Sequence, residues 1–301
     1  MNLSLYDNCT LCPRNCGVNR SRGVLGYCGR SATLTAARAA LHPWEEPIIS
    51  GTQGSGTIFF SGCNLKCIYC QNRNIALGQS GREITPERLS QICLELQEKG
   101  AHNINLVTPS HYVPHIVKAL ESARLQGLHI PIVYNTGGYE SPDTLRMLKG
   151  LVDIYLPDLK YYSSELSSAF SHAPDYFPVA TAAISEMFRQ VGPPVINGEN
   201  GLLQRGVVVR HLLLPGETKD SKKILRYLHE TYGENIYISI MNQYTPLPQV
   251  AEHPILSRQV TPAEYERVLD FARRIGITRG FCQEGDTVSE SFIPAFDGEG
   301  L

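Results

Sequence analysis

The sequence predicts an α/β protein built on a parallel sheet, and three observations support this fold class. From Thr57 onward, short apolar segments rich in β-branched and aromatic residues alternate with longer segments whose apolar residues recur at helical spacing. This alternation repeats about six times, which is typical of strand–helix units with the helices outside the sheet. Polar residues follow the predicted strands, as expected where the carboxyl ends of parallel strands meet. Crossovers of this kind are right-handed, so the sheet should curl in one direction.

The predicted elements begin with a buried strand at residues 57–61. The first helix is expected at residues 86–99, because Thr85 is a good N-cap and Pro86 suits the first helical position. Its apolar residues share one face of the helix: Leu89, Ile92, Cys93 and Leu96. Further strands are expected at residues 103–108, 130–135, 152–156, 206–214 and 236–241. Further helices are expected at residues 114–126, 142–149, 164–170, 176–190, 219–232 and 262–275.

We expect the 301 residues to fall into three parts. Residues 1–56 form a cysteine-rich segment that is irregular apart from the alanine-rich stretch 33–41. Residues 57–275 carry the strand–helix units, and residues 276–301 form a C-terminal tail that caps them. No internal repeat or low-complexity tract interrupts this organisation.

The composition argues against several classes of protein. The chain has 27 basic and 29 acidic residues and a formal net charge of −2, so charge gives no reason to expect nucleic acid as a partner. No run approaches ~18 consecutive apolar residues, so no membrane span is expected. The first residues lack the basic-then-apolar pattern of a secretion signal. Nine cysteines in such a chain predict reduced thiols and bound metal in a cytoplasmic protein.

Three cysteines directly after the first predicted strand carry the strongest functional signal. Cys63, Cys67 and Cys70 have the spacing Cys-x3-Cys-x2-Cys. Thiolates are the ligands of iron–sulfur clusters, and a cluster of four irons normally takes four of them. Three ligands on one loop leave one iron open to a substrate or cofactor. Structural zinc normally needs a fourth ligand, and buried free cysteines alone do not explain this spacing.

The cysteine motif, with Tyr69 before its last cysteine, resembles the signature of the radical S-adenosylmethionine superfamily. The stretch 50–63 is similar to the segment before the cluster in pyruvate formate-lyase activating enzymes and in uncharacterised relatives with an N-terminal four-cysteine motif. The resemblance is densest over residues 46–72 and extends weakly to Tyr244.

This resemblance implies a fold and a chemistry. The fold implied is a partial (β/α)6 TIM-like barrel, and the cofactors implied are a 4Fe-4S cluster and S-adenosylmethionine. An external one-electron reductant such as flavodoxin or ferredoxin is the implied partner. The reaction implied is reductive cleavage of S-adenosylmethionine to a 5′-deoxyadenosyl radical that abstracts hydrogen. The cofactor supplies that chemistry, and the protein positions it.

Polar residues near the cluster loop and the strand ends are the candidates for binding S-adenosylmethionine, because ligands of parallel sheets bind beyond the carboxyl ends of the strands. A turn or a solvated strand end explains any one of these residues, but not their recurrence after successive strands. The candidates are Tyr69, Thr108, Ser110, Asn135, Asp158, Lys160, Arg210 and Gln243. Lys160 or Arg210 suits the cofactor carboxylate. Asn135 and Asp158 suit the amino group or the ribose hydroxyls, and the backbone of Tyr69 suits the adenine.

The resemblance extends to single residues beyond the cysteines, with two departures. Residues 158–160 match an Asp-Leu-Lys of the activating enzymes, and Arg210 falls where they have an arginine ahead of a Leu-Pro-Gly. Those enzymes usually have Gly-Gly-Glu after strand two, where residues 108–110 of this chain are Thr-Pro-Ser. Asn135 likewise replaces an expected aspartate. The departures leave open whether the reaction is glycyl-radical formation.

A second cysteine group lies near the N-terminus with the spacing Cys-x2-Cys-x3-Cys-x11-Cys: Cys9, Cys12, Cys16 and Cys28. Four thiolates suit a closed structural zinc site or a fully ligated second iron–sulfur cluster. Some activating enzymes carry a ferredoxin-like cluster insert after the cluster loop. This chain has none there, which makes the N-terminal group a candidate electron relay. A role without metal is the third alternative.

Three functions therefore stay open from the sequence. The first is an activase that forms a glycyl radical on a partner enzyme, and the second is radical modification of a small molecule or a peptide. The third is a non-catalytic iron–sulfur or zinc protein for electron transfer or binding. Cys282, near the C-terminus, is a candidate catalytic thiol that would donate hydrogen to a substrate radical.

Overall fold

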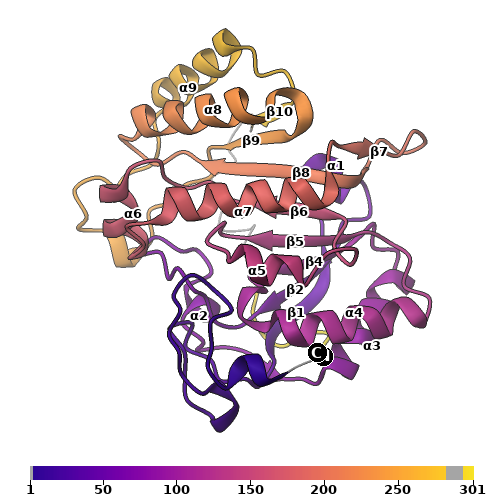
Figure 1. Cartoon of the computed structure of the whole chain (residues 1–301). Helices are drawn as coiled ribbons and strands as arrows, with labels where there is room; N and C mark the ends of the chain where they lie inside the picture. Colours follow the sequence, from indigo (N-terminus) through magenta and orange to yellow (C-terminus); the bar gives the residue numbers. More distant parts are fainter. Residues whose placement is uncertain (1–2, 283–293) are drawn as a thin grey trace.

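A ten-stranded sheet runs through the centre of the protein (Figure 1). The computed structural model describes residues 3–282 and 294–301. The strands lie in the order β10-β9-β8-β6-β5-β4-β2-β1-β3, and β7 pairs with β8. The parallel strands are β2 (Ser55–Phe60), β4 (Ile104–Val107), β5 (Ile132–Thr136), β6 (Ile154–Pro157), β8 (Leu203–Leu212), β9 (Tyr237–Met241) and β10 (Gly280–Cys282). The antiparallel strands are β1 (Thr35–His42), β3 (Arg82–Glu83) and β7 (Val195–Ile196).

Helices follow the parallel strands and cover one side of the sheet (Figure 1). The longer helices are α3 (Pro86–Glu98), α4 (Val113–Leu125), α7 (Tyr176–Val191), α8 (Thr218–Tyr232) and α9 (Pro262–Ile275). The shorter ones are α1 (Pro47–Ser50), α2 (Arg73–Ala76), α5 (Pro142–Arg146) and α6 (Ser164–Ser171). Short 3-10 turns occupy Leu3–Tyr6, Arg20–Arg22, Ser110–Tyr112, Gly233–Asn235 and Pro248–Val250. The sheet does not close, since its order ends at β10 on one side and β3 on the other, and this confirms the predicted partial barrel.

The strand–helix units agree with the predicted order, and one further parallel strand, β10, follows the last of them. The predicted N-cap and proline signals are present at α3, where the Thr85 hydroxyl accepts from the Arg88 amide. At α9, Thr261 and Glu264 form a capping box. These local signals explain why the starts of both helices were predicted correctly.

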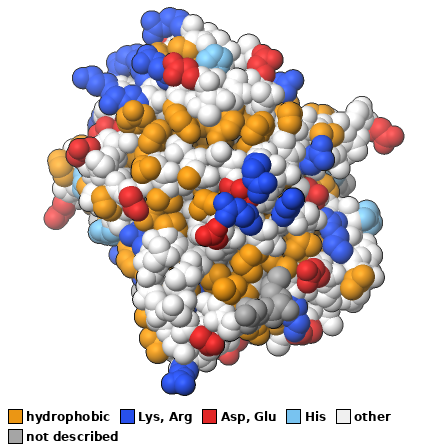
Figure 2. Space-filling model, viewed as in Figure 1, with side chains coloured by type: hydrophobic (Ala, Val, Ile, Leu, Met, Phe, Trp, Pro, Cys, Tyr) orange, Lys and Arg blue, Asp and Glu red, His pale blue; other side chains and the backbone are white. Residues whose placement is uncertain are grey.

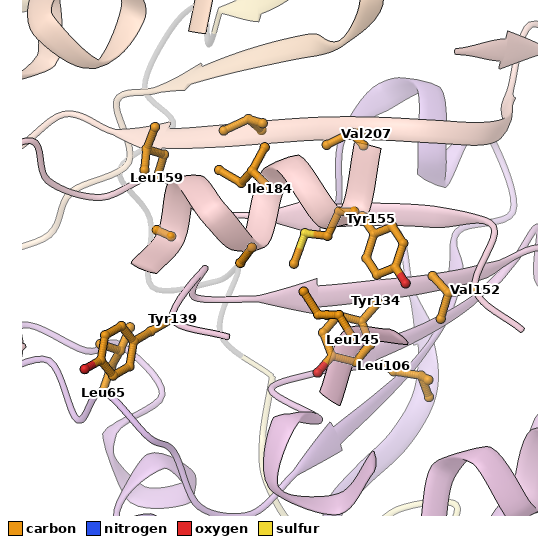
Figure 3. Packing of buried hydrophobic residues seen from close by; sticks show 14 of the residues in the cluster. Leu65, Leu106, Tyr134, Tyr139, Leu145, Val152, Tyr155, Leu159, Ile184 and Val207 are labelled. Atoms are coloured by element: carbon orange, nitrogen blue, oxygen red, sulfur yellow. The ribbon is translucent and has the colours of Figure 1, made fainter. Parts of the chain in front are cut away.

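Two apolar layers hold the sheet. On the helix side, Tyr134, Tyr155 and Val207 project from the strands toward Leu145 of α5 and Ile184 of α7 (Figure 3). On the other side, Ile49 of α1 belongs to a cluster of buried residues from β5, β6 and β8: Val133, Ile154, Leu156, Leu203 and Val208. The helix α1 therefore fills the amino-terminal end of the half-barrel and leaves the carboxyl ends of the strands for the site.

The alanine-rich stretch 33–41, which the sequence sets apart from the irregular N-terminal segment, is a strand. Residues 35–42 form β1, which pairs antiparallel with β2 and extends the sheet. Alanine has no strong strand propensity, but Ala36, Ala37 and Ala39 are buried between neighbouring strands and the layers around them. Pairing with β2 therefore decides that residues 35–42 form a strand, and the sequence of this stretch alone does not predict it.

Part of the predicted capping tail lies against the sheet at β1. The Ala39 amide donates to the Glu299 carbonyl at 2.8 Å, and the Gly298 amide donates to the Ala37 carbonyl at 3.0 Å. The ring of Phe296 packs on Phe59 with 5.4 Å between centroids. Residues 294–301 thus cover an edge of the sheet, while the rest of the tail after residue 282 lies outside the described residues.

The surface is mixed in charge. Figure 2 shows basic and acidic side chains gathered over α5 and α7, where Arg146 pairs with Asp143 and Arg189 pairs with Glu186. Within the described residues, no helix has the length and apolar character needed to cross a membrane.

We predict that Gly138→Ala destabilises the protein far more than Gly150→Ala. Both glycines have φ near +80°, which alone costs an alanine about 1–2 kcal/mol. A Cβ at Gly138 would also overlap the Asp158 carbonyl and lie 3.0 Å from the Tyr176 hydroxyl, whereas a Cβ at Gly150 meets nothing within 4 Å. Urea unfolding of the two metal-free variants measures the difference, and equal losses would contradict the packing described for the end of β5.

Candidate functional site

The three cysteines of the motif line one cavity beyond the carboxyl ends of the parallel strands. The loop turns sharply after β2, because Gly62 has φ of +95° and Lys66 has φ of +55°. The cavity measures about 240 Å³. Its walls include Cys63, Asn64, Cys67, Tyr69, Cys70, Gln71, Thr108, Asn135, Asp158, Lys160, Arg210, Gln243 and Tyr244.

The thiols suit an iron–sulfur cluster once they lose their protons. Burial raises the pKa of Cys63, and burial raises the pKa of Cys70 to about 12. Binding of a metal must therefore displace these protons. Within the described residues, no three or more His, Cys, Asp or Glu side chains already stand together as ligands of a single metal ion. In a 4Fe-4S cluster each thiolate binds a different iron, so such a cluster does not need three side chains arranged around one ion.

A pair of cations and a carboxylate form one wall of the cavity. The Lys160 ammonium lies 2.5 Å from Asp158 Oδ2, and Arg210 Nε lies 2.9 Å from Asp158 Oδ1. Burial alone would raise the pKa of Asp158, but the charges of Arg210 and Lys160 hold that pKa below its usual range. These three residues come from the ends of β6 and β8, so one electrostatic contact fixes both strand ends.

Glu45 supports this charged wall from behind through its ion pair with Arg210, and it was missed from the sequence. It precedes α1, which carries it into the half-barrel from the amino-terminal side. Its carboxylate accepts from Asn105 Nδ2 at 2.8 Å and pairs with Arg210 Nη1 at 3.4 Å. Arg210 Nη2 also donates to Asn135 Oδ1 at 2.6 Å. No sequence motif identifies Glu45, because it meets Arg210 only in the folded chain.

The two predicted cations, Arg210 and Lys160, differ in how many of their donors are already used within the protein. Arg210 gives its Nε and both terminal nitrogens to Asp158, Asn135 and Glu45. Lys160 bonds to one carboxylate oxygen and also lines the cavity. An ammonium has three donors, so Lys160 is better placed than Arg210 to meet a further carboxylate.

Of the other predicted cofactor-binding residues, three line the cavity and one does not. Tyr69, Thr108 and Gln243 line the cavity. Thr108 has φ of +57°, a strained conformation for a β-branched residue of the kind often found at functional sites. Ser110 does not line the cavity, because its hydroxyl bonds to Glu140 in the buried region beside β5.

Glu140 is a second buried carboxylate that was missed from the sequence. It accepts hydrogen bonds from the hydroxyls of Ser110, Thr136 and Tyr134. Burial raises its pKa to about 7, although the three hydroxyls counteract this shift. It follows a Gly-Gly turn that reads only as a loop in the sequence, so no local signal marks it.

Cys282 lies apart from the site residues. It ends β10 at the edge of the sheet and is exposed. It lines a separate small cavity with residues of β9 and α9, and it does not line the cavity of the three cysteines. Its predicted role as a hydrogen donor stays a prediction.

The four N-terminal cysteines gather around a buried arginine. Cys9, Cys12 and Cys28 are buried and Cys16 is half-buried. Arg20 is 1% exposed, and its Nη1 donates to Cys9 Sγ at 3.6 Å. Its other hydrogen bonds go to backbone carbonyls. Within residues 3–282 and 294–301, Arg20 forms no ion pair with a carboxylate.

The N-terminal cysteine segment also touches the cluster loop directly. Arg14 Nε donates to the Asn64 carbonyl at 2.8 Å. A side chain at Gly62 would meet the Cys28 carbonyl at 2.7 Å. The two cysteine groups are therefore neighbours in the fold, although more than thirty residues separate Cys28 from Cys63 in sequence.

With this geometry in hand, comparison with known proteins identifies the class. The family model for the radical SAM superfamily matches residues 57–228, more than half of the chain. The protein therefore belongs to the radical SAM superfamily. Members of this superfamily perform radical chemistry that depends on S-adenosylmethionine and a 4Fe-4S cluster, and they need an external reductant.

Individual proteins are similar to this chain in sequence or in fold. The uncharacterized protein MJ0674 of Methanocaldococcus jannaschii is 28% identical over 284 residues, which cover 91% of this chain and 77% of that protein. The FeFe-hydrogenase maturase HydG from Carboxydothermus hydrogenoformans has a TM-score of 0.52 at 14% identity, covering 79% of this chain and 55% of that one. SuiB of Streptococcus suis, bound to its precursor peptide SuiA, has a TM-score of 0.52 at 14% identity, covering 75% and 47%. These two structures share the fold with this chain.

We predict that Glu140 makes the protein less stable as the pH rises. Its raised pKa means that the folded state binds more protons than the unfolded state between pH 4.5 and about 7. The stabilisation that Glu140 contributes is therefore fully present below pH 4.5 and is lost as the pH rises from there to about 7. Relative to Glu140→Gln, which does not titrate, the wild type should lose up to about 3 kcal/mol between about pH 5 and about pH 8.

Unfolding of both proteins at the two pH values measures this difference. Glu121→Gln, an exposed change of the same kind on α4, is the control and should behave as the wild type. Identical pH dependence in wild type and Glu140→Gln would show that the buried carboxyl does not titrate in this range.

Proposed function

We propose that the protein cleaves S-adenosylmethionine reductively at a 4Fe-4S cluster held by Cys63, Cys67 and Cys70, and that the resulting 5′-deoxyadenosyl radical abstracts hydrogen from a substrate in the same cavity. One observation carries this proposal: three thiols from one loop and a charged wall from the strand ends face a single cavity. Three protein ligands leave one iron for the cofactor.

The residues of the cavity would bind and orient the cofactor. Lys160 is the proposed partner of its carboxylate, because Arg210 is occupied by three acceptors. Asn135 and Thr108, which line the cavity, would supply acceptors for its amino group or ribose, and the backbone of Tyr69 is the proposed partner of the adenine. Buried aromatic rings around Tyr69 keep water from that side of the cavity.

Two substrate classes fit this chemistry. Activation of a glycyl-radical enzyme is supported by the Asp-Leu-Lys segment at residues 158–160, which lines the cavity through Asp158 and Lys160. Modification of a small molecule or a peptide is favoured by residues 108–110, because Thr-Pro-Ser supplies no carboxylate to the described cavity wall. The nearby Glu140 bonds to Ser110 outside the cavity. A partner-bound glycyl radical seen by electron paramagnetic resonance (EPR) marks the first class, and a modified product formed without a partner protein marks the second.

The proposed setting is a reducing one. All nine cysteines are free thiols in the structure, which supports a cytoplasmic location and electron supply by a flavodoxin or ferredoxin.

We predict that the anaerobically reconstituted and reduced protein converts S-adenosylmethionine to 5′-deoxyadenosine, and that Cys67→Ala abolishes this conversion. The physical reason is that two thiolates cannot hold the open-sited cluster. Chromatographic measurement of 5′-deoxyadenosine gives the readout. Cys93→Ala is the matched control, since Cys93 is buried on α3 outside the cavity and its loss should leave activity near wild type.

No 5′-deoxyadenosine from wild-type protein with a verified cluster, in the presence of reductant, would contradict the proposal. That outcome would favour the non-catalytic electron carrier.

We also propose that the N-terminal cysteines bind a metal centre as thiolates. Arg20 supports this proposal, because it has no carboxylate partner in the part of the chain that the structure describes, and a buried guanidinium is costly unless an anion balances its charge. Thiolates bound to a metal are such an anion. The contact between Cys28 and Gly62 favours a second iron–sulfur cluster that relays electrons over structural zinc.

We predict that a variant with Cys63, Cys67 and Cys70 all changed to alanine still binds about four irons per chain. Iron and zinc analysis, with the visible spectrum of the reconstituted variant, measures this. Stoichiometric zinc would contradict the relay, and a folded variant without metal would contradict the metal centre itself.

A further inference from the structure

A chain of three buried hydroxyls ends on the middle cysteine of the motif. Ser171, the last residue of α6, lies with its Oγ 2.9 Å from Cys67 Sγ. The Tyr161 hydroxyl lies 2.7 Å from Ser171 Oγ, and the Tyr69 hydroxyl lies 2.6 Å from that of Tyr161. Ser171 and Tyr161 have no exposed surface, and Tyr69 has 6%. The chain is therefore shielded from solvent along its length.

The direction of these bonds is fixed once Cys67 binds a metal. A metal-bound thiolate has no proton, so it can only accept a hydrogen bond. Ser171 must then donate to Cys67, and its own oxygen accepts from Tyr161. Tyr161 in turn accepts from Tyr69. Hydrogen bonds aligned in one direction in a low-dielectric interior strengthen one another.

The three cluster cysteines differ in this respect. Cys63 Sγ accepts from the backbone amide of Leu65 at 3.4 Å. Within the described part of the chain, only Cys67 among the three takes a hydrogen bond from another side chain. The Cys67 sulfur is thus electrostatically distinct from the other two, and a cluster bound here would be affected at the iron that it ligates.

We propose that Ser171 is a positioning residue that sets the reduction potential of the cluster through its hydrogen bond to Cys67, with Tyr161 and Tyr69 aligning that bond. The inference rests on the proposed function, because it needs a cluster at these cysteines. A donor to a ligating sulfur stabilises the more negative, reduced state and so raises the potential. The cluster then accepts an electron from an external one-electron donor more readily.

Backbone contacts hold Ser171 against the loop. The Ile68 amide donates to the Phe170 carbonyl at 2.9 Å, which joins the cysteine loop to the end of α6. Arg14 Nη2 donates to the Ser171 carbonyl at 3.0 Å, and the same guanidinium binds the Asn64 carbonyl through Nε at 2.8 Å. Arg14 stands between Cys12 and Cys16. The N-terminal cysteine segment therefore helps to fix the distance between Ser171 and Cys67.

The test is a redox titration of the reduced cluster, followed by EPR, on anaerobically reconstituted full-length protein. The signal of this cluster is identified by its response to S-adenosylmethionine. We expect a more negative midpoint potential in Ser171→Ala than in the wild type. Tyr161→Phe should shift it in the same direction by a smaller amount, because Ser171 still donates but is no longer aligned. Ser171→Thr keeps the hydroxyl and should restore the potential.

The matched control is Ser167→Ala, one helical turn earlier on α6. Ser167 is also buried, but its hydroxyl bonds to the Ser164 carbonyl, so its loss should leave the potential unchanged. A midpoint in Ser171→Ala equal to that of the wild type, at equal iron content, would overturn the inference. If Ser171→Ala fails to hold iron, Tyr161→Phe decides, and an unchanged midpoint there overturns it.

Failure of this inference is distinguishable from failure of the proposed function. Formation of 5′-deoxyadenosine by the wild type reports on the function, and the midpoint potentials of the variants report on Ser171. If the wild type cleaves S-adenosylmethionine and all variants have the same midpoint potential, the proposed function stands and the proposed role of Ser171 is wrong.

Discussion

The partly buried contact of Arg210 with Asp158 is the constraint on which the site depends. An ion pair at low exposure is stable only if every charge has a partner, and loss of one partner typically costs about 3–5 kcal/mol. Asp158 therefore holds Lys160 and Arg210 together, and Glu45 takes the remaining side of the guanidinium. These contacts draw together the ends of β6 and β8 and the segment before α1, and so they shape the cavity wall opposite the cysteine loop.

The cysteine loop is held from the outside by a different set of contacts. Arg14 and the carbonyl of Cys28 meet the loop at Asn64 and Gly62, and the end of α6 meets it at Ile68. The loop is thus enclosed by the N-terminal segment on one side and by the half-barrel on the other. This enclosure explains how three thiols from a short loop can be kept facing one cavity, and why the two cysteine groups belong to one functional region.

Much of this arrangement follows from local sequence signals, and the remainder depends on long-range contacts. The helices α3 and α9 and the cluster loop carry their own caps, periodicity and spacing, so the sequence predicts them. The strand β1 depends on pairing with β2 and has an alanine-rich sequence of low strand propensity. Glu45 contacts Arg210 and Asn105, which are distant in sequence, and Glu140 lies in a turn after β5 that carries no motif. The sequence therefore marks neither residue. Ser110 was predicted to face the cofactor because its position in the chain suited that role, but its hydroxyl bonds to Glu140.

The central claim is that the cluster at Cys63, Cys67 and Cys70 has one iron open to S-adenosylmethionine. The most direct measurement is the EPR spectrum of the reduced protein before and after addition of S-adenosylmethionine. Binding at the open iron predicts a change in the g-values of this cluster. A spectrum that stays the same at saturating cofactor, from protein with a full iron complement, would contradict the claim.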